Sequence, residues 1–268
     1  MTLTGGKIWG EVSESFLSNL KNNLTAGGKT YRPVSLWVNW PVTDNSKQHL
    51  ILGGGEKFLH PNVDPSLLSG IMLNPMQQSE PSKIALFSEA QYAWKQWKSE
   101  EEAKKVNDIA FNFVENGKFT DSEASIAFRE LGKHMINQNM DGRVVKLEES
   151  VELAPKLATF MSKLKAGQDV SAEREGLRAE FAKLKAAAQL YKASGDEKMR
   201  AQIHYWLDNT IDQMDALSAL LDGTEAIARN DSAKLWDSYY KGLKLYEQSQ
   251  TYTFHYVDHD EKAELGVQ

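Results

Sequence analysis

Prolines are unevenly distributed along this chain of 268 residues, and this limits its possible folds more than any other feature. Six of the seven prolines and five of the seven tryptophans precede residue 98. Because proline removes a backbone donor and ends helices, elements before that point must be short. Long helices are expected only after it. We therefore predict a boundary near Trp97 and Lys98.

The first part of the chain alternates two kinds of apolar pattern. Val34 to Trp40 and Leu67 to Leu73 are short runs of β-favouring and apolar residues, which predict buried strands. Glu11 to Asn22 and Glu80 to Trp97 repeat apolar residues at the spacing of one helix face. Strands that alternate with helices indicate part of an α/β sheet or barrel.

The second part repeats apolar residues at intervals of three and four almost throughout, which predicts a series of helices. Short turn signals at 167–169, 194–196 and 222–224 separate the later ones, so successive helices should run antiparallel as a bundle. The tail from residue 251 opens with alternating aromatic residues, which predict an extended strand. The predicted helices are Lys104 to Asn116, Asp121 to Asn137 with Asp121 or Ser122 as its cap, Leu147 to Leu164, Leu177 to Tyr191, Met199 to Leu221, and Ser232 to Gln248.

Composition excludes several classes of function. The net charge of -6 gives no broad positive field, which disfavours nucleic-acid binding. The absence of cysteine excludes disulfides, thiolate zinc sites and a cysteine nucleophile. The six histidines show no paired ligand spacing, so we expect no metal and no cofactor. No apolar run approaches the ~20 residues of a membrane span, and the start lacks the features of a signal peptide.

Polar residues gather at the end of the first predicted strand, where it meets a proline-marked turn. Trp37, Asn39 and Asp44 supply an aromatic surface, a carboxamide and a carboxylate within eight residues. This set suits a sugar, whose ring has apolar faces and a fringe of hydroxyl groups. In the alternative interpretation the tryptophans belong to the core and Asp44 caps a following helix. The pattern alone leaves both open.

A second strand end, Leu73-Asn74-Pro75-Met76, precedes a helix that contains Ser82-Lys83-Ile84-Ala85-Leu86-Phe87 and then Tyr92-Ala93-Trp94. In this order, the W-x-N-x-P-V-x-D strand end, a glycine-containing loop, the N-P-M strand end and the helix motif resemble the bacterial family-84 glycoside hydrolases. That family includes O-GlcNAcase-like β-N-acetylglucosaminidases, often named hyaluronidases. The resemblance covers residues 3–98 at the level of motifs.

The resemblance implies a fold class. In the family the corresponding strands close a (β/α)8 barrel, and a helical domain follows. We therefore expect a mainly α chain, with the C-terminal part of a (β/α)8 barrel over residues 1–98 and an antiparallel helical bundle over 99–250. Residues 251–268 form the tail.

The resemblance also implies roles for four residues. Asp44 resembles the aspartate that accepts hydrogen bonds from sugar hydroxyl groups, and Asn74 resembles the asparagine that binds a neighbouring hydroxyl. Trp37 resembles the tryptophan that lines the pocket for the N-acetyl group. Asn39 resembles the asparagine beside the catalytic carboxylates. We expect these residues to bind substrate.

The catalytic residues of the family have no counterpart here. Family members use two adjacent aspartates, one to orient the acetamido nucleophile of the substrate and one as general acid and base. The sequence contains no adjacent aspartate pair, and Asp258-His259-Asp260, the nearest approximation, fits a solvated tail. We therefore expect a chain without catalytic residues that is inactive alone, although the family hydrolyses terminal N-acetylglucosaminides.

Partners and location follow from the same resemblance. We expect a glycan or glycoprotein that contains N-acetylglucosamine, and a secreted or cell-surface location. Strands taken from a barrel expose unpaired backbone groups, so we also expect either the missing N-terminal barrel half or self-association at that edge. The alternative function is a non-catalytic helical module that binds a protein or a glycan.

Overall fold

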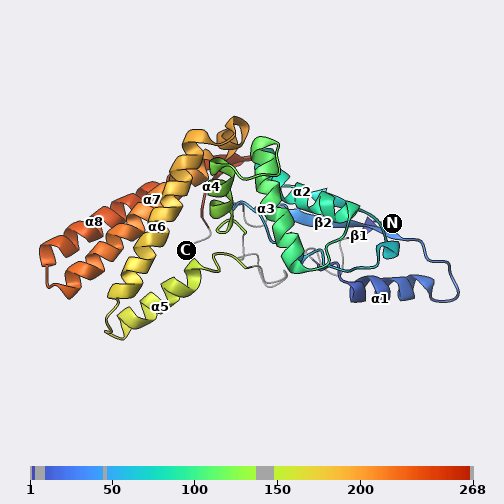
Figure 1. Cartoon of the computed structure of the whole chain (residues 1–268), viewed down its shortest axis with the longest axis horizontal. Coiled ribbons are helices and arrows are strands. Elements are labelled where there is room, and N and C mark those ends of the chain that lie inside the picture. The colour runs from blue at the N-terminus through green and yellow to red at the C-terminus, as the bar shows by residue number, and fades with distance from the viewer. Residues whose placement is uncertain (1, 4–9, 45–46, 137–147, 266–268) are drawn as a thin grey trace. The chain divides into compact units, whose positions relative to one another are not determined.

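The computed structural model describes residues 2–3, 10–44, 47–136 and 148–265 (Figure 1). The chain divides into two compact units, one formed by Met1–Ser125 with Met135–Glu148 and the other by Ile126–His134 with Glu149–Gln268. The fold is mainly α-helical and includes a helical bundle, which confirms the predicted class. The division near residues 98 and 250 stays a prediction.

A small parallel sheet forms the centre of the first unit. Its strands are ordered β1 (Thr2–Leu3), β2 (Val34–Pro41) and β3 (Leu68–Asn74), so both predicted strands are present. The predicted burial is wrong for β3, because its residues are half-buried or exposed. Burial alternates along β2, because Leu36 and Trp40 lie in the core while Trp37 on the opposite face is exposed. One face of β2 is therefore buried, where the sequence indicated burial without distinguishing the faces.

Among the described residues of the first unit, three helices and two short 3-10 turns accompany this sheet. Ser13 accepts a hydrogen bond from the N–H of Phe16 at 3.2 Å, which starts the first helix three residues later than predicted. Ser99 caps the third helix in the same way by accepting from Glu102. The second helix packs against both long strands and the third helix. The elements are α1 (Glu14–Thr25), η1 (Gly55–Lys57), η2 (Pro65–Leu67), α2 (Ser79–Trp94) and α3 (Glu100–Asn116).

The second unit contains the long helices, and consecutive members from α5 to α8 pack against each other (Figure 1). Its core includes Phe181 and Tyr191 from α6 with Ile203 and Trp206 from α7. Phe128 of α4 stacks on Tyr191, with ring centroids 4.5 Å apart. The helices are α4 (Glu123–Gly132), whose first turn is capped by Ser122, α5 (Leu153–Lys165), α6 (Ser171–Ser194), α7 (Glu197–Ala228) and α8 (Ser232–Ser249).

The predicted turn at 222–224 is wrong, because α7 continues through it to Ala228. Asp222 pairs with Arg178 of α6, and Glu225 pairs with the same guanidinium at 2.9 Å. Gly223 is buried against α8, and a Cβ added to it would lie in ordinary contact with Leu235 and Ser238. Packing and ion pairing on both sides of the helix therefore outweigh the roughly 1 kcal/mol by which glycine weakens a helix interior.

The tail forms a hairpin of β4 (Thr253–Tyr256) and β5 (His259–Lys262), which confirms the predicted strand. Phe254 packs on Trp206 with ring centroids 4.6 Å apart, so the hairpin is anchored to the helices. Asp258, His259 and Asp260 are exposed. Among the described helices, none has both the length and the apolar character needed to cross a membrane.

Candidate functional site

The carboxyl ends of β2 and β3 lie at the same edge of the sheet. The two strands are parallel, and Pro41 at the end of β2 is paired in register with Asn74 at the end of β3. The side chains of Asn39 and Asn74 meet across the strands, because Nδ2 of Asn74 donates to Oδ1 of Asn39 at 3.1 Å. Two predicted site residues, 35 positions apart in sequence, are thus in contact.

Trp37 joins the same cluster. Residues two apart on a strand share a face, and the indole Nε1 of Trp37 donates to Oδ1 of Asn39 at 2.6 Å. The Trp37 side chain is 40% exposed, and its register partner Met72 on β3 is 42% exposed. The cluster therefore presents an open aromatic surface beside two carboxamides, a combination that can stack on a sugar ring and exchange hydrogen bonds with its hydroxyl groups.

Asp44 lies in an exposed turn three residues beyond the end of β2. Its predicted place in the site stays a prediction. The alternative role as a helix cap is wrong, because the next described helical segment begins only at Gly55 and has Gly54 at its cap position. The alternative assignment of the tryptophans to the core holds for Trp40, which is fully buried, and not for Trp37.

The segment after Asn74 is fixed by the start of α2. The N–H of buried Met76 donates to Oγ of Ser82 at 3.1 Å, and that hydroxyl donates to the carbonyl of Gln78 at 2.7 Å. The N–H of Ile51 approaches Sδ of Met76 at 3.2 Å. Ser82 thus connects the two sequence motifs and holds the end of β3. Sequence reasoning missed this role, although the serine stands within the quoted motif.

Glu89 on α2 is a second feature that the sequence did not indicate. Its side chain is fully buried, and neither carboxyl oxygen has a hydrogen-bond partner within the described residues. Desolvation by burial raises the pKa of Glu89 well above its ordinary value, because the apolar surroundings disfavour the charged form. Burial of Glu89 inside the first unit therefore favours its neutral form. No described contact joins it to the Trp37, Asn39 and Asn74 cluster.

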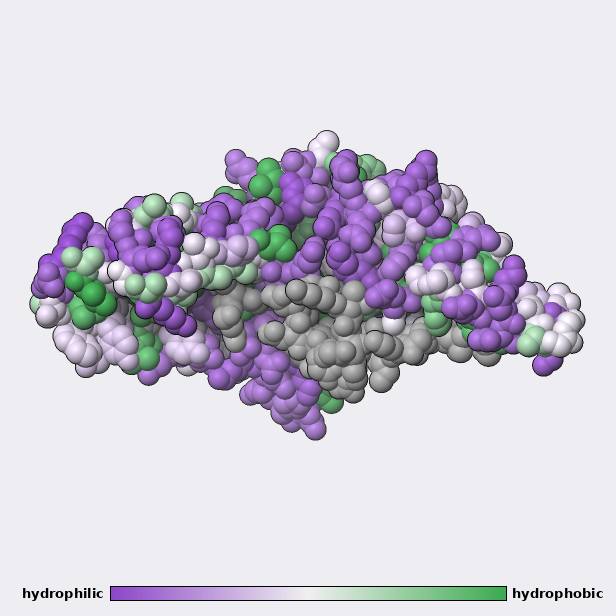
Figure 2. Space-filling view, turned by 90° about the horizontal axis from the view of Figure 1, so that it is seen from below, coloured by the Kyte–Doolittle hydropathy of each residue, from purple (hydrophilic) through white to green (hydrophobic). Residues whose placement is uncertain are grey.

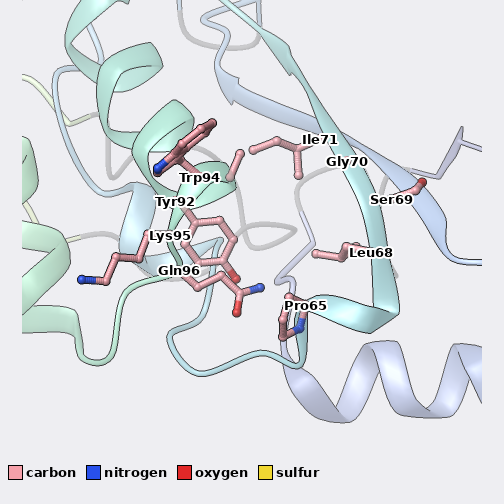
Figure 3. A pocket seen from close by; sticks show the side chains of 10 residues that line it. Pro65, Leu68, Ser69, Gly70, Ile71, Tyr92, Trp94, Lys95 and Gln96 are labelled. Atoms are coloured by element: carbon pink, nitrogen blue, oxygen red, sulfur yellow. The ribbon is translucent and has the colours of Figure 1, made fainter.

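A hollow of about 320 Å³ lies between the first half of β3 and the last turn of α2 (Figure 3). Tyr92 and Ile71 face this space, and the neighbouring Trp94 is 93% exposed. The hydroxyl of Tyr92 donates to the carbonyl of His60 at 2.8 Å, which fixes the ring. Because the hollow is at the opposite end of β3 from Asn74, it is separate from the predicted sugar site.

Comparisons with known families identify the class of protein. The family model described as β-N-acetylglucosaminidase matches residues 1–131. A second model, described as hyaluronidase post-catalytic domain-like, matches residues 152–252. The chain thus combines a glycosidase-type segment with the helical segment that follows such a catalytic domain.

Solved structures share the fold of this chain. The protein called CpGH84D matches with a TM-score of 0.84 and 24% identity over 97% of this chain. CpGH84B matches with a TM-score of 0.73 and 23% identity over 92% of this chain. An O-GlcNAc hydrolase mutant from Thermobaculum terrenum matches with a TM-score of 0.66 and 18% identity over 92% of this chain. This chain spans 41%, 41% and 54% of the lengths of those three chains. Identities this low establish the shared fold alone.

Together, the two family matches and this shared fold support a chain that resembles the C-terminal portion of family-84 glycoside hydrolases.

Proposed function

We propose that this chain carries the sugar-binding residues of a β-N-acetylglucosaminidase that acts on terminal N-acetylglucosamine of glycans or glycoproteins. The observation that carries the proposal is the hydrogen-bonded cluster of Trp37, Asn39 and Asn74 at the carboxyl edge of parallel strands. In parallel α/β folds, ligands bind at this edge. Trp37 lies against the N-acetyl group, and Asn74 with Asp44 binds hydroxyl groups at the other side of the ring.

The proposed role is binding, and the catalytic carboxyl groups come from elsewhere. Substrate-assisted hydrolysis needs two carboxyl groups near the anomeric carbon. The cluster and its neighbouring turn supply one, Asp44, and the sequence has no adjacent aspartate pair. The chains of CpGH84D and CpGH84B are more than twice as long as this chain, so further segments longer than this chain are available in that architecture.

We propose that this further segment completes a barrel on the sheet of the first unit. In the described sheet β3 is an outer strand, and its outer edge offers unpaired backbone groups. Trp37 and Met72 are exposed on one face of the same sheet. Added strands would pair with β3 and extend the sheet, and would leave Trp37 at the carboxyl edge open to the sugar. A secreted or cell-surface location is part of the same proposal, and it rests on the family resemblance.

An activity assay tests whether this chain binds the sugar without supplying the catalytic carboxyl groups. The pure chain should not hydrolyse a chromogenic N-acetylglucosaminide, because it lacks the acid and base that protonate the leaving group and activate water. Turnover that co-purifies with the chain, and that disappears when Asp44 or Asn74 is replaced, would contradict a purely binding role.

Retention on immobilised N-acetylglucosamine tests the binding residues. The wild-type chain should be retained and released by the free sugar, while Asn74→Ala and Asp44→Ala should elute early. The matched controls are Asn23→Ala and Asp108→Ala, which remove the same groups from exposed positions on α1 and α3. Equal retention of all four variants would show that the predicted residues are not the sugar site.

A further inference from the structure

Helix α8 has one face of small residues that it buries against α7. Ser238, Gly242 and Ser249 are buried, and they recur at the spacing of one side of a helix. A Cβ added at Gly242 would lie 3.2 Å from the carbonyl oxygen of Ala216 on α7, so the two backbones approach closely there. Among the described elements, α7 is the principal neighbour of α8. The remaining circumference of α8 is therefore largely uncovered.

The uncovered side of α8 is unusually aromatic for a surface helix. Trp236 is 55% exposed and Tyr240 is 62% exposed, and Tyr239, Leu243 and Tyr246 are exposed as well. Trp236 stacks on Tyr240 with ring centroids 5.9 Å apart, and Tyr239 meets both rings edge-on. Contiguous exposed apolar residues of this kind mark interaction surfaces, and Trp and Tyr are enriched where proteins bind each other.

A hollow of about 410 Å³ lies beside this aromatic side, in the groove between α7 and α8. In Figure 2 the end of the chain formed by α7 and α8, at the left, carries pale and green residues next to each other. The groove is lined by Gln213, Ala216, Leu217, Leu220, Tyr239, Gly242, Leu243 and Tyr246. Because this lining is almost entirely apolar, it suits apolar side chains better than the hydroxyl groups of a glycan.

We propose that the aromatic side of α8 binds the same side of α8 in a second copy of this chain. A two-fold contact requires one surface that complements itself. The exposed rings of Trp236, Tyr239 and Tyr240 provide projections, and the groove beside Leu243 provides the depression that receives them. Both features occur on one patch, as an isologous dimer requires.

The charges along α8 favour an antiparallel arrangement. Asp237 and Lys244 are exposed, and they lie equally far on either side of the midpoint between Tyr240 and Lys241. An antiparallel pair centred at that midpoint brings Lys244 opposite the partner's Asp237, and symmetry repeats the pair. A parallel pair in register would instead oppose like charges, which is unfavourable.

The available area makes this dimer weak and dependent on concentration. A fully covered aromatic side chain buries about 150–250 Å². Four aromatic side chains per copy, each about half exposed, therefore supply roughly 400 Å². A standard stable interface buries about 800 Å² per partner. We expect a reversible dimer with a dissociation constant in the micromolar range or weaker.

Sedimentation equilibrium of the full chain across about 1–300 μM, a range that brackets such constants, tests the proposal. The mass should rise toward that of a dimer, and Trp236→Lys should weaken association at least tenfold. Lys244→Glu and Asp237→Lys should each weaken it, and the double variant should restore it because the charge pair is exchanged. Phe119→Lys, at an exposed aromatic residue of the first unit, is the matched control and should leave association unchanged.

Three results would overturn the proposal. The first is a monomer at every concentration. The second is association that Met72→Lys abolishes and Trp236→Lys does not, which would place the contact on the exposed sheet of the first unit. The third is an unchanged mass in Trp236→Lys together with loss of retention on immobilised N-acetylglucosamine, which would assign the aromatic side to glycan binding. Circular dichroism of each variant confirms that it is folded.

Discussion

Glu89 places a carboxyl group inside the first unit without a hydrogen-bond partner among the described residues. Burial raises its pKa, so the folded chain keeps a proton that the unfolded chain releases above a pH of about 4.5. The free energy of unfolding should therefore fall as the pH rises above that value, by at most about 1.4 kcal/mol per pH unit. Glu89→Gln keeps the shape, has no proton to lose, and should remove this fall.

Urea unfolding followed by tryptophan fluorescence between about pH 5 and pH 8 measures this difference. The variant should be the more stable chain at the upper end of the range, with a flatter dependence on pH. A parallel pH dependence in wild type and variant would contradict the assignment of Glu89 as a buried neutral acid.

His134 gives the second unit the opposite dependence on pH. Its ring is buried, with Nδ1 2.7 Å from Oγ of Ser150, and desolvation lowers the pKa of His134 from 6.5 to about 4. Between these two pKa values the unfolded chain binds a proton at His134 and the folded chain does not. The free energy of unfolding therefore falls as the pH drops from 6.5 to about 4. The loss should reach about 3 kcal/mol when both forms are charged. His134→Gln should reduce it.

Hydrogen exchange of the amides in α6 and α7 between about pH 4 and pH 7 measures the free energy of unfolding of the second unit separately from the first, once the rates are corrected for intrinsic exchange. His204→Gln is the matched control, since His204 is a less buried histidine on α7 of the same unit. If protection against unfolding declined equally in wild type and His134→Gln, another group would be responsible.

At this scale, the sequence placed Trp37, Asn39 and Asn74 at the ends of two predicted strands, and the parallel pairing of those strands brings the three side chains into contact. Their role in sugar binding rests on the family resemblance and stays a prediction. Ser82 and Glu89 could not be assigned. Their roles depend on how α2 packs on the sheet, and apolar spacing along one helix does not specify which groups its neighbours place around it.

The contact between α7 and α8 depends on small side chains. Gly242→Leu should force the helices apart at Ala216, because an added Cβ already lies within 3.2 Å of that carbonyl oxygen. Overpacking of this kind costs about 1–3 kcal/mol. Lys241→Leu, at the adjacent exposed position, is the matched control and should change the stability by less than about 0.5 kcal/mol. Equal thermal midpoints for the two variants would show that the helices can move apart freely.

The apolar spacing predicted that the helices form, whereas the residues at which they begin and end depend on caps and tertiary contacts. The first helix starts where Ser13 caps it, although the apolar pattern begins earlier. At the end of α7, the Asp-Gly sequence predicted a turn, and the bonds of Asp222 and Glu225 to Arg178 keep the chain helical instead. Arg178 is 44 residues away from Asp222, so a local reading of the sequence could not anticipate this pairing.

For the whole molecule, the two-part organisation rests on different physical causes. In the first unit β2 has one buried and one exposed face, and β3 is the outer strand of the described sheet with no fully buried residue. The second unit is held by apolar seams between consecutive helices, and its hairpin adds Phe254 to that core. Proline placement predicted short elements followed by long helices, and the boundary near residue 98 stays a prediction. The exposed face of β2 could not be predicted from the sequence, because a run of apolar and polar residues does not show which of them other elements cover.

The indole N–H of Trp37 offers the most direct test of the central claim, that the two strand ends form a site for N-acetylglucosamine. This group donates to Asn39, which also accepts from Asn74, so its proton resonance should respond to sugar at the site. We predict that N-acetylglucosamine shifts the Trp37 indole signal, assigned with Trp37→Phe, at roughly millimolar concentration. Glucose should not shift it, and Asn74→Ala should abolish the response. An unchanged Trp37 signal, or an equal response to both sugars, would contradict the account.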